Sequence, residues 1–379
     1  MVQSRLHSQT HQEKAQRAPQ AQTAAAGLAG AARAPRISIG RHYMTIGFAL
    51  WLVSGIFVDG YAHNHNVPES FFTPWHALLY SGFLASACWM AWLTYESKRK
   101  TGLPWLKAIP DGYSVGLIGV AIFLLGGLSD MMWHIIFGIE QDIAALLSPS
   151  HLMLLVGGLL ILASPFRAAW NDAGLAKPTW RVFTPVLLSV AFTLGIVSFF
   201  LMYAWTFRYN LAGLKTTEWY MNQFYSMHIM EVNATRGVTF IILNTIQFML
   251  PVFLLIKRWV LPKGTITALF TALTVMMSVL DGFENFPAIV IGFAAGIVAD
   301  VLYRLMRPSD QRIGAMRMFA LAVPIVLWSF YFLVLELTDR IGWDTELWTG
   351  AIVSAALASL ALSLLSVPPK MPDTEQHEA

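Results

Sequence analysis

Long apolar stretches fill most of this chain, and short polar segments separate them. Ten stretches stand out, at residues 43–62, 74–95, 113–137, 149–165, 182–206, 236–256, 264–281, 286–304, 314–337 and 347–367. A run of about 20 apolar residues is long enough to cross the hydrocarbon core of a bilayer as an α-helix. The pattern therefore predicts an all-α, polytopic integral membrane bundle of about ten transmembrane helices.

The polar segments divide the chain into four parts. Residues 1–40 are rich in Ala, Gln and Arg, which predicts a disordered, basic cytoplasmic tail. Residues 41–170 hold the first four predicted helices, residues 171–368 hold six more, and residues 369–379 form a second cytoplasmic tail. The segment 218–232 mixes apolar and polar residues, which favours a short helix at the membrane interface.

Composition and charge agree with a membrane protein and indicate its orientation. The chain is 56% hydrophobic and 12% charged, with a mean hydropathy of +0.55, which excludes an ordinary soluble domain. Of the 25 Lys and Arg residues, 21 fall in the tails and in the loops on one side of the predicted helices. Because cytoplasmic loops carry the excess of positive charge, we expect a multi-pass protein of the cell (inner or plasma) membrane with both termini in the cytoplasm. The single cysteine, Cys88, excludes internal disulfides and Cys-based metal clusters.

One polar pattern occurs twice in the apolar region, 71 residues apart. Each copy has an Asp and a His four positions apart near the end of one predicted helix, and a second His at the start of the next. The two sets are Asp59, His63 and His76, and Asp130, His134 and His151. In each copy the second His follows a Thr/Ser-Pro-x sequence and precedes a Gly by six positions. The pattern indicates an internal duplication of a two-helix unit, with all six side chains on the extracytoplasmic side.

These residue types and spacings suit a metal site. Residues i and i+4 share one face of a helix, and a hairpin can bring the second His back to them. Ionisable side chains in a membrane are costly and are usually retained for function. Two imidazoles and one carboxylate leave coordination positions open and suit copper, iron or zinc. A structural interpretation also stands, because Ser/Thr-Pro-x-His is a good helix start and the six residues could hydrogen-bond across the duplication.

Five further residues on the same side are candidate additional ligands. His65 follows the first Asp/His pair, and His228 and Glu231 lie in a segment that could form a lid over the polar layer. Methionines near His228 would suit Cu(I) as soft ligands. Asp281 and Glu284 belong to an Asp-Gly-Phe-Glu-Asn sequence that echoes the Asp-Gly-Tyr-Ala-His sequence of residues 59–63. A plain loop between two helices explains that echo equally well.

At these residues the chain resembles a membrane subunit of the copper membrane monooxygenases, the family of particulate methane and ammonia monooxygenases. In that family an Asp-x3-His-x12-His triad holds copper, and its last His lies in a Phe-Thr-Pro-Ser-His string. Asp59, His63 and His76 keep the spacing, and Phe-Thr-Pro-Trp-His at residues 72–76 keeps most of the string. The family also has an Asn-His-His set downstream, whose place Asp130, His134 and His151 would take. The resemblance covers about residues 45–165, implies copper at both sets, and leaves six helices unmatched.

We therefore expect an integral membrane metal-binding protein, with copper as its metal and iron or zinc as the alternatives. It would be an oxidase or monooxygenase component acting on a small or lipophilic substrate at the extracytoplasmic side. Its expected partners are the lipid bilayer and other membrane proteins of an assembly or an electron donor, with no nucleic acid. Three other functions stay open: a metal transporter or sensor without catalysis, a haem b protein with His76 and His151 as axial ligands, and a zinc-dependent membrane hydrolase.

Overall fold

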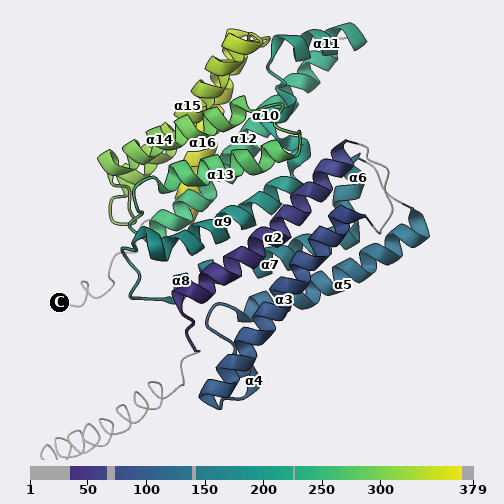
Figure 1. Ribbon diagram of the computed structural model, residues 1–379. Coiled ribbons are helices and arrows are strands. Elements are labelled where there is room, and N and C mark those ends of the chain that lie inside the picture. The colour runs from purple at the N-terminus through teal and green to yellow at the C-terminus, as the bar shows by residue number, and fades with distance from the viewer. Residues whose placement is uncertain (1–34, 66–72, 139–141, 225–226, 369–379) are drawn as a thin grey trace, which may run out of the picture.

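The protein is an all-α bundle of long helices joined by short connections (Figure 1). The computed structural model describes residues 35–65, 73–138, 142–224 and 227–368. In this part of the chain no strand forms, and only two isolated β-bridges occur. The predicted tails lie outside the described residues, except for residues 35–40, where the first long helix already begins.

Ten helices correspond to the ten apolar stretches of the sequence. In chain order they are α2 (Ile39–Asn64), α3 (Pro74–Thr101), α5 (Ser114–Phe137), α7 (Pro149–Leu162), α9 (Trp180–Phe200), α12 (Met227–Arg258), α13 (Thr265–Val279), α14 (Pro287–Met306), α15 (Ile313–Thr338) and α16 (Thr345–Ser366). Short helices connect them: α4 (Trp105–Ala108), α6 (Asp142–Leu147), α8 (Ser164–Asn171), α10 (Thr206–Tyr209) and α11 (Leu214–Phe224).

Nine spans among the described residues are long and apolar enough to cross a membrane, with α7 and α8 together forming one of them. The remaining helix, α13, has only 15 residues. Every residue of α13 is buried or half-buried, so it lies inside the bundle and is covered by other helices. The prediction of a polytopic membrane bundle is confirmed.

The predicted helix at 182–206 ends earlier in the structure. Helix α9 stops at Phe200 and is followed by a 3-10 turn over Met202–Ala204 and then by α10. The buried side chain of Asn244, on α12, accepts from the Thr206 nitrogen at 2.8 Å and donates to the Ala204 oxygen at 3.1 Å. This amide satisfies backbone groups that the break would otherwise leave buried without partners, which is why the chain can leave the helix here.

The segment 218–232 also differs from the single interfacial helix expected. Its first part ends α11, and its last part forms the first turns of α12, which starts at Met227. Residues 225–226 between them lie outside the described residues.

Helices α2 and α3 form a tightly packed hairpin. A Cβ atom added at Gly55 would overlap the Leu79 backbone, and one at Gly82 would lie 2.7 Å from the Leu52 nitrogen. Only glycine allows backbones to approach this closely, so these two positions set the spacing of the hairpin.

Helices α5 and α7 repeat the same hairpin. A Cβ atom at Gly126 would lie 3.0 Å from the Leu154 nitrogen, and one at Gly157 would lie 2.6 Å from the Phe123 nitrogen. Gly55 and Gly126 precede the aspartate of their copy by four residues. The duplicated sequence pattern is therefore also a duplicated backbone contact.

The two hairpins meet along α3 and α5, and a small hydrophobic cluster fills the space between their helices. At its centre the rings of Phe83 and Phe123 stack with their centroids 4.6 Å apart. A larger core joins α9 and the later helices and also takes in residues of α2 and α7. The single cysteine, Cys88, lies on the exposed side of α3.

Candidate metal centre

The first predicted set converges at the end of the α2–α3 hairpin where α2 finishes and α3 begins. The Nε2 atom of His76 lies 3.2 Å from Oδ1 of Asp59, and the Nε2 atom of His63 lies 3.7 Å from Oδ2 of the same carboxylate. The centroids of the two imidazole rings lie 6.2 Å apart, and the ring planes are inclined at 63°. His76 is buried, and the other two residues are half-buried.

Local sequence places His76. Thr73 has extended backbone geometry and is the N-cap of α3, where its hydroxyl accepts from the His76 nitrogen at 3.3 Å, while Pro74 fills the first turn. The same hydroxyl lies 3.0 Å from Nδ1 of the His76 ring. One side chain therefore starts the helix and holds the far side of the imidazole, so that Nε2 faces Asp59.

The second set has nearly the same geometry at the end of the α5–α7 hairpin. The Nε2 atoms of His151 and His134 lie 3.3 Å and 3.6 Å from the two oxygens of Asp130. The imidazole ring centroids lie 6.1 Å apart, and the ring planes are inclined at 64°. Ser148 caps α7 and contacts Nδ1 of His151 at 2.7 Å, as Thr73 does for His76.

The imidazole of His134 is also held on the side away from the carboxylate. Its Nδ1 lies 3.3 Å from the carbonyl oxygen of Gly138, which can only accept a hydrogen bond, so Nδ1 carries the proton. Gly138 has φ = 84° and ψ = −173°, a backbone conformation that glycine adopts readily, and it caps the end of α5. The other ring nitrogen, Nε2, faces Asp130.

In each set, three potential ligand atoms lie within 4.8 Å of one another. They are two imidazole nitrogens and one carboxylate oxygen, which attract a cation between them. Metal-bound histidines usually have their second nitrogen held by a hydrogen bond, as Thr73, Gly138 and Ser148 provide here. The arrangement can hold a metal ion with three protein ligands and leave other coordination positions open.

The second carboxylate has hydroxyl partners that the sequence did not lead us to expect. Ser150, on α7, donates to Oδ1 of Asp130 at 3.1 Å. Tyr80, which comes from α3 in the other hairpin, donates to Oδ2 at 3.4 Å. The Ser-Pro-Ser-His sequence could have pointed to Ser150, but no local pattern identifies Tyr80.

The two sets are neighbours. His63 of the first set interacts electrostatically with all three residues of the second, His134, His151 and Asp130. The Tyr80 hydroxyl interacts in the same way with both aspartates. The two sets therefore lie close enough for their charged groups to interact.

Three of the five additional candidate ligands join neither set. His65 is exposed; its ring lies against that of Tyr61 at a tilt of 30°, and its Nδ1 donates to the Tyr61 backbone oxygen at 2.8 Å. His228 and Glu231 are also exposed and face each other at 3.5 Å on the first turns of α12. None of the three belongs to a group of converging ligand atoms in the described part of the chain.

Asp281 and Glu284 form the turn between α13 and α14. Asp281 accepts from the Asn285 amide at 2.8 Å, and Glu284 is exposed. Phe283 within the turn has φ = 65°, and Gly282 has φ = 62°. The Asp-Gly-Phe-Glu-Asn sequence therefore forms a compact, hydrogen-bonded turn, and it belongs to no group of converging ligand atoms among the described residues.

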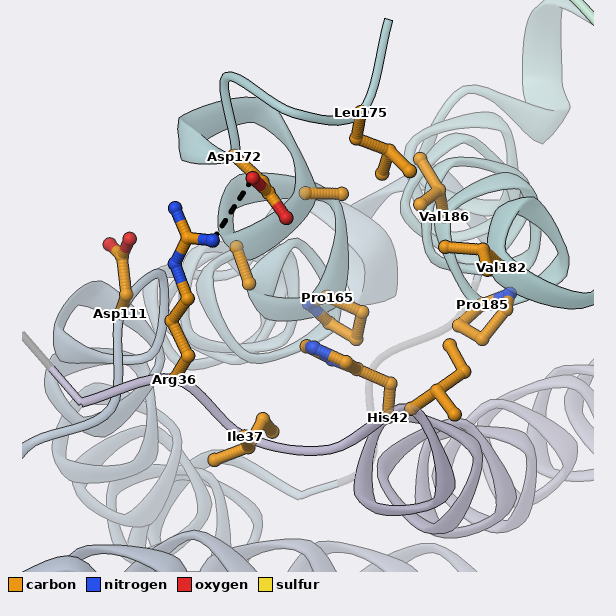
Figure 2. Close-up of a pocket in the computed structure, with 13 residues that line it drawn as sticks. Arg36, Ile37, His42, Asp111, Pro165, Asp172, Leu175, Val182, Pro185 and Val186 are labelled. Carbon is orange, nitrogen blue, oxygen red and sulfur yellow. Dashed lines mark ion pairs between the residues drawn. The ribbon is translucent and has the colours of Figure 1, made fainter. Parts of the chain in front are cut away.

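A separate cavity of about 200 Å³ lies beside the start of α2 (Figure 2). Arg36 pairs with Asp172 at 3.1 Å on its polar side, and proline, leucine and valine side chains line the other. His42 reaches into it and contacts the Tyr113 hydroxyl at 3.1 Å; burial raises the pKa of that hydroxyl, which stays protonated. His42 precedes Asp59 by 17 residues, roughly 25 Å along a helix, so this cavity is distinct from the metal centre.

Comparison with known proteins identifies no relative of this chain. No protein-family model, curated protein or solved structure matches the chain. The interpretation of the two sets therefore rests on the residues themselves.

Proposed function

We propose that this membrane protein binds copper at two sets, Asp59–His63–His76 and Asp130–His134–His151, and serves as a component of a membrane oxidase or monooxygenase. The observation that carries the proposal is the repeated convergence of two imidazole nitrogens on one carboxylate. One such cluster has an ordinary structural explanation as a capped and hydrogen-bonded helix end. Two clusters with nearly the same ring geometry, built by duplicated hairpins, favour a shared chemical role.

The donor atoms support copper without excluding iron or zinc. Imidazole binds all three metals, and copper(II) binds most tightly among the divalent ions of its row. A bound copper ion would supply one-electron chemistry toward dioxygen. The protein's own contribution is to hydrogen-bond the imidazoles on the side away from the metal, keep Asp130 buried and Asp59 half-buried, and leave coordination positions open. Both sets lie at helix ends next to the bilayer, where a small lipophilic substrate can approach.

Two of the alternative functions gain little from the structure. A haem held by His76 and His151 needs their Nε2 atoms to face one another, whereas each faces the aspartate of its own set. A transport path would draw on Asp300, the buried acid near the other end of the bundle. That carboxylate instead accepts from the Thr267 nitrogen and hydroxyl at the start of α13, where it stabilises a helix terminus.

Metal analysis of the purified full-length protein tests the proposal. The wild type should hold two copper ions per chain, one for each set. His76→Ala together with His151→Ala should lose most of this copper, because each set is left with one imidazole and one carboxylate. X-ray absorption on the loaded wild type should show imidazole nitrogen and carboxylate oxygen around copper.

A matched control is His65→Ala, since His65 lies beside the first set but turns away from it. This variant should keep the full copper content. Copper retained by the double variant, or lost equally in the control, would overturn the assignment. If the wild type holds zinc or iron in place of copper, the two sites stand and the metal assigned to them changes.

A further inference from the structure

The contact between the two hairpins breaks the symmetry of the duplication. Tyr80 follows His76 by four residues, and the corresponding residue of the second copy is Leu155. Gly127 precedes Asp130 by three residues, and the corresponding residue of the first copy is Ile56. The copies therefore differ at two positions, and Tyr80 and Gly127 both lie where α3 of one hairpin packs against α5 of the other.

These two differences fit each other in space. A Cβ atom at Gly127 would lie 2.8 Å from Cε1 of Tyr80, so only a glycine leaves room for the tyrosine ring. One turn further along, Phe83 and Phe123 stack across the same pair of helices. The Tyr80 side chain is thus held in a fixed place between α3 and α5.

Tyr80 contacts both ligand sets from this place. Its ring centroid lies 6.4 Å from that of His76, one turn earlier on the same helix. Its hydroxyl donates to Oδ2 of Asp130, the oxygen that faces His134. The remaining oxygen of Asp130 is held by Ser150, which belongs to the second hairpin itself. Tyr80 thus brings the first hairpin into contact with a ligand of the second.

We propose that Tyr80 is a positioning residue that couples the two sets, so that metal bound at Asp59–His63–His76 strengthens metal binding at Asp130–His134–His151. This inference rests on the proposed function, because it requires both sets to bind metal. Metal bound by His76 fixes the first turn of α3, and Tyr80 lies on the next turn of the same helix. The fixed hydroxyl then holds Asp130 in the orientation that a ligand needs. Coupling of this kind is reciprocal, so metal in the second set strengthens the first by the same factor.

Titration of detergent-solubilised full-length protein with Cu(II), against a chromophoric chelator, measures the coupling. With Tyr80 present, disabling the first set by His76→Ala should weaken the second set. Tyr80→Phe keeps the ring and removes the hydroxyl, and should weaken the second set by about 10- to 100-fold, the usual effect of losing a hydrogen bond to a ligand. In the Tyr80→Phe background, His76→Ala should weaken the second set no further.

Two variants sharpen the test. Ser150→Ala removes the other hydroxyl from Asp130, so it should weaken the second set yet leave its dependence on His76 unchanged. Gly127→Ala disturbs the Tyr80 ring from the opposite helix and should abolish that dependence, as Tyr80→Phe does. If both sets bind copper and His76→Ala has the same effect with and without the Tyr80 hydroxyl, the coupling role is overturned and the metal sites stand. If the wild type binds no metal, the proposed function and this inference are both overturned.

Discussion

Single hydroxyl groups do two jobs at once in this protein. Ser148 accepts a hydrogen bond from the backbone nitrogen of His151 and also contacts the ring of the same residue. Thr73 does both for His76. One side chain therefore both starts the helix and orients the ligand, so a substitution there affects both roles together.

Replacing Ser148 with alanine should expose this double role. Loss of the cap should cost about 1 kcal/mol of stability. Loss of the contact to Nδ1 should lower copper affinity by about tenfold. The decrease should be confined to the second set, so the first set serves as an internal reference in a two-site titration. Equal weakening of both sets would instead point to a general loss of structure.

Much of the site could be predicted from local sequence. The spacing of Asp59 and His63 places both on one helix face, and the Thr-Pro-x-His sequence places His76 at a helix start, so short-range rules suffice. Tyr80 could not be found in this way. Its role depends on where α3 meets α5, a contact between residues about 50 positions apart that periodicity does not encode.

Glycines decide how the helices of each hairpin pack. Gly55 and Gly82 bring the backbones of α2 and α3 together, and this close approach places His76 over Asp59. The ligand geometry at the end of the hairpin therefore depends on glycines one or two turns away. A change there should affect the metal set without touching a ligand.

Two alanine substitutions in the same helix test this dependence. Gly55→Ala should destabilise the protein by about 1–3 kcal/mol, because the new methyl group overlaps the backbone of Leu79. Gly47→Ala meets nothing within 4 Å and should be neutral or stabilising by about 0.5–1 kcal/mol, the usual gain from alanine in a helix. Thermal unfolding in detergent measures both. Equal effects of the two substitutions would contradict the role given to the glycine contact.

At the level of elements, the sequence predicts helices better than their interruptions. All ten apolar stretches form helices, since hydrophobic length is a strong signal. The sequence does not predict the early end of α9 at Phe200, because the residues that follow are still apolar. The break is possible only because Asn244, about 40 residues downstream, supplies hydrogen bonds to it.

Across the whole molecule, basic residues gather on one predicted side of the membrane and the ligand sets on the other. The predicted cytoplasmic side carries 21 of 25 basic residues, and both ligand sets lie where the hairpins turn on the other side. Their loops are the segments between α2 and α3 and between α5 and α7 (Figure 1). A protein inserted in this orientation would present its metal sets to the extracytoplasmic side.

Cysteine labelling tests this orientation. In a Cys88→Ser background, Thr101→Cys at the end of α3 and Thr338→Cys at the end of α15 place single thiols at exposed positions on opposite sides. A membrane-impermeant maleimide added to intact cells should label the cysteine at position 338 and leave that at position 101 unlabelled until the membrane is opened. The reverse pattern would invert the topology and place the metal sets in the cytoplasm.

The exposed cysteine on α3 has a practical consequence. Cys88 and the ligand His76 lie on one continuous helix, 12 residues apart, which corresponds to roughly 18 Å. A nitroxide attached to this native thiol would sit within magnetic range of a paramagnetic ion in the first set. The protein thus carries its own reporter position, from which the filling of one set can be followed by spin relaxation without an engineered residue.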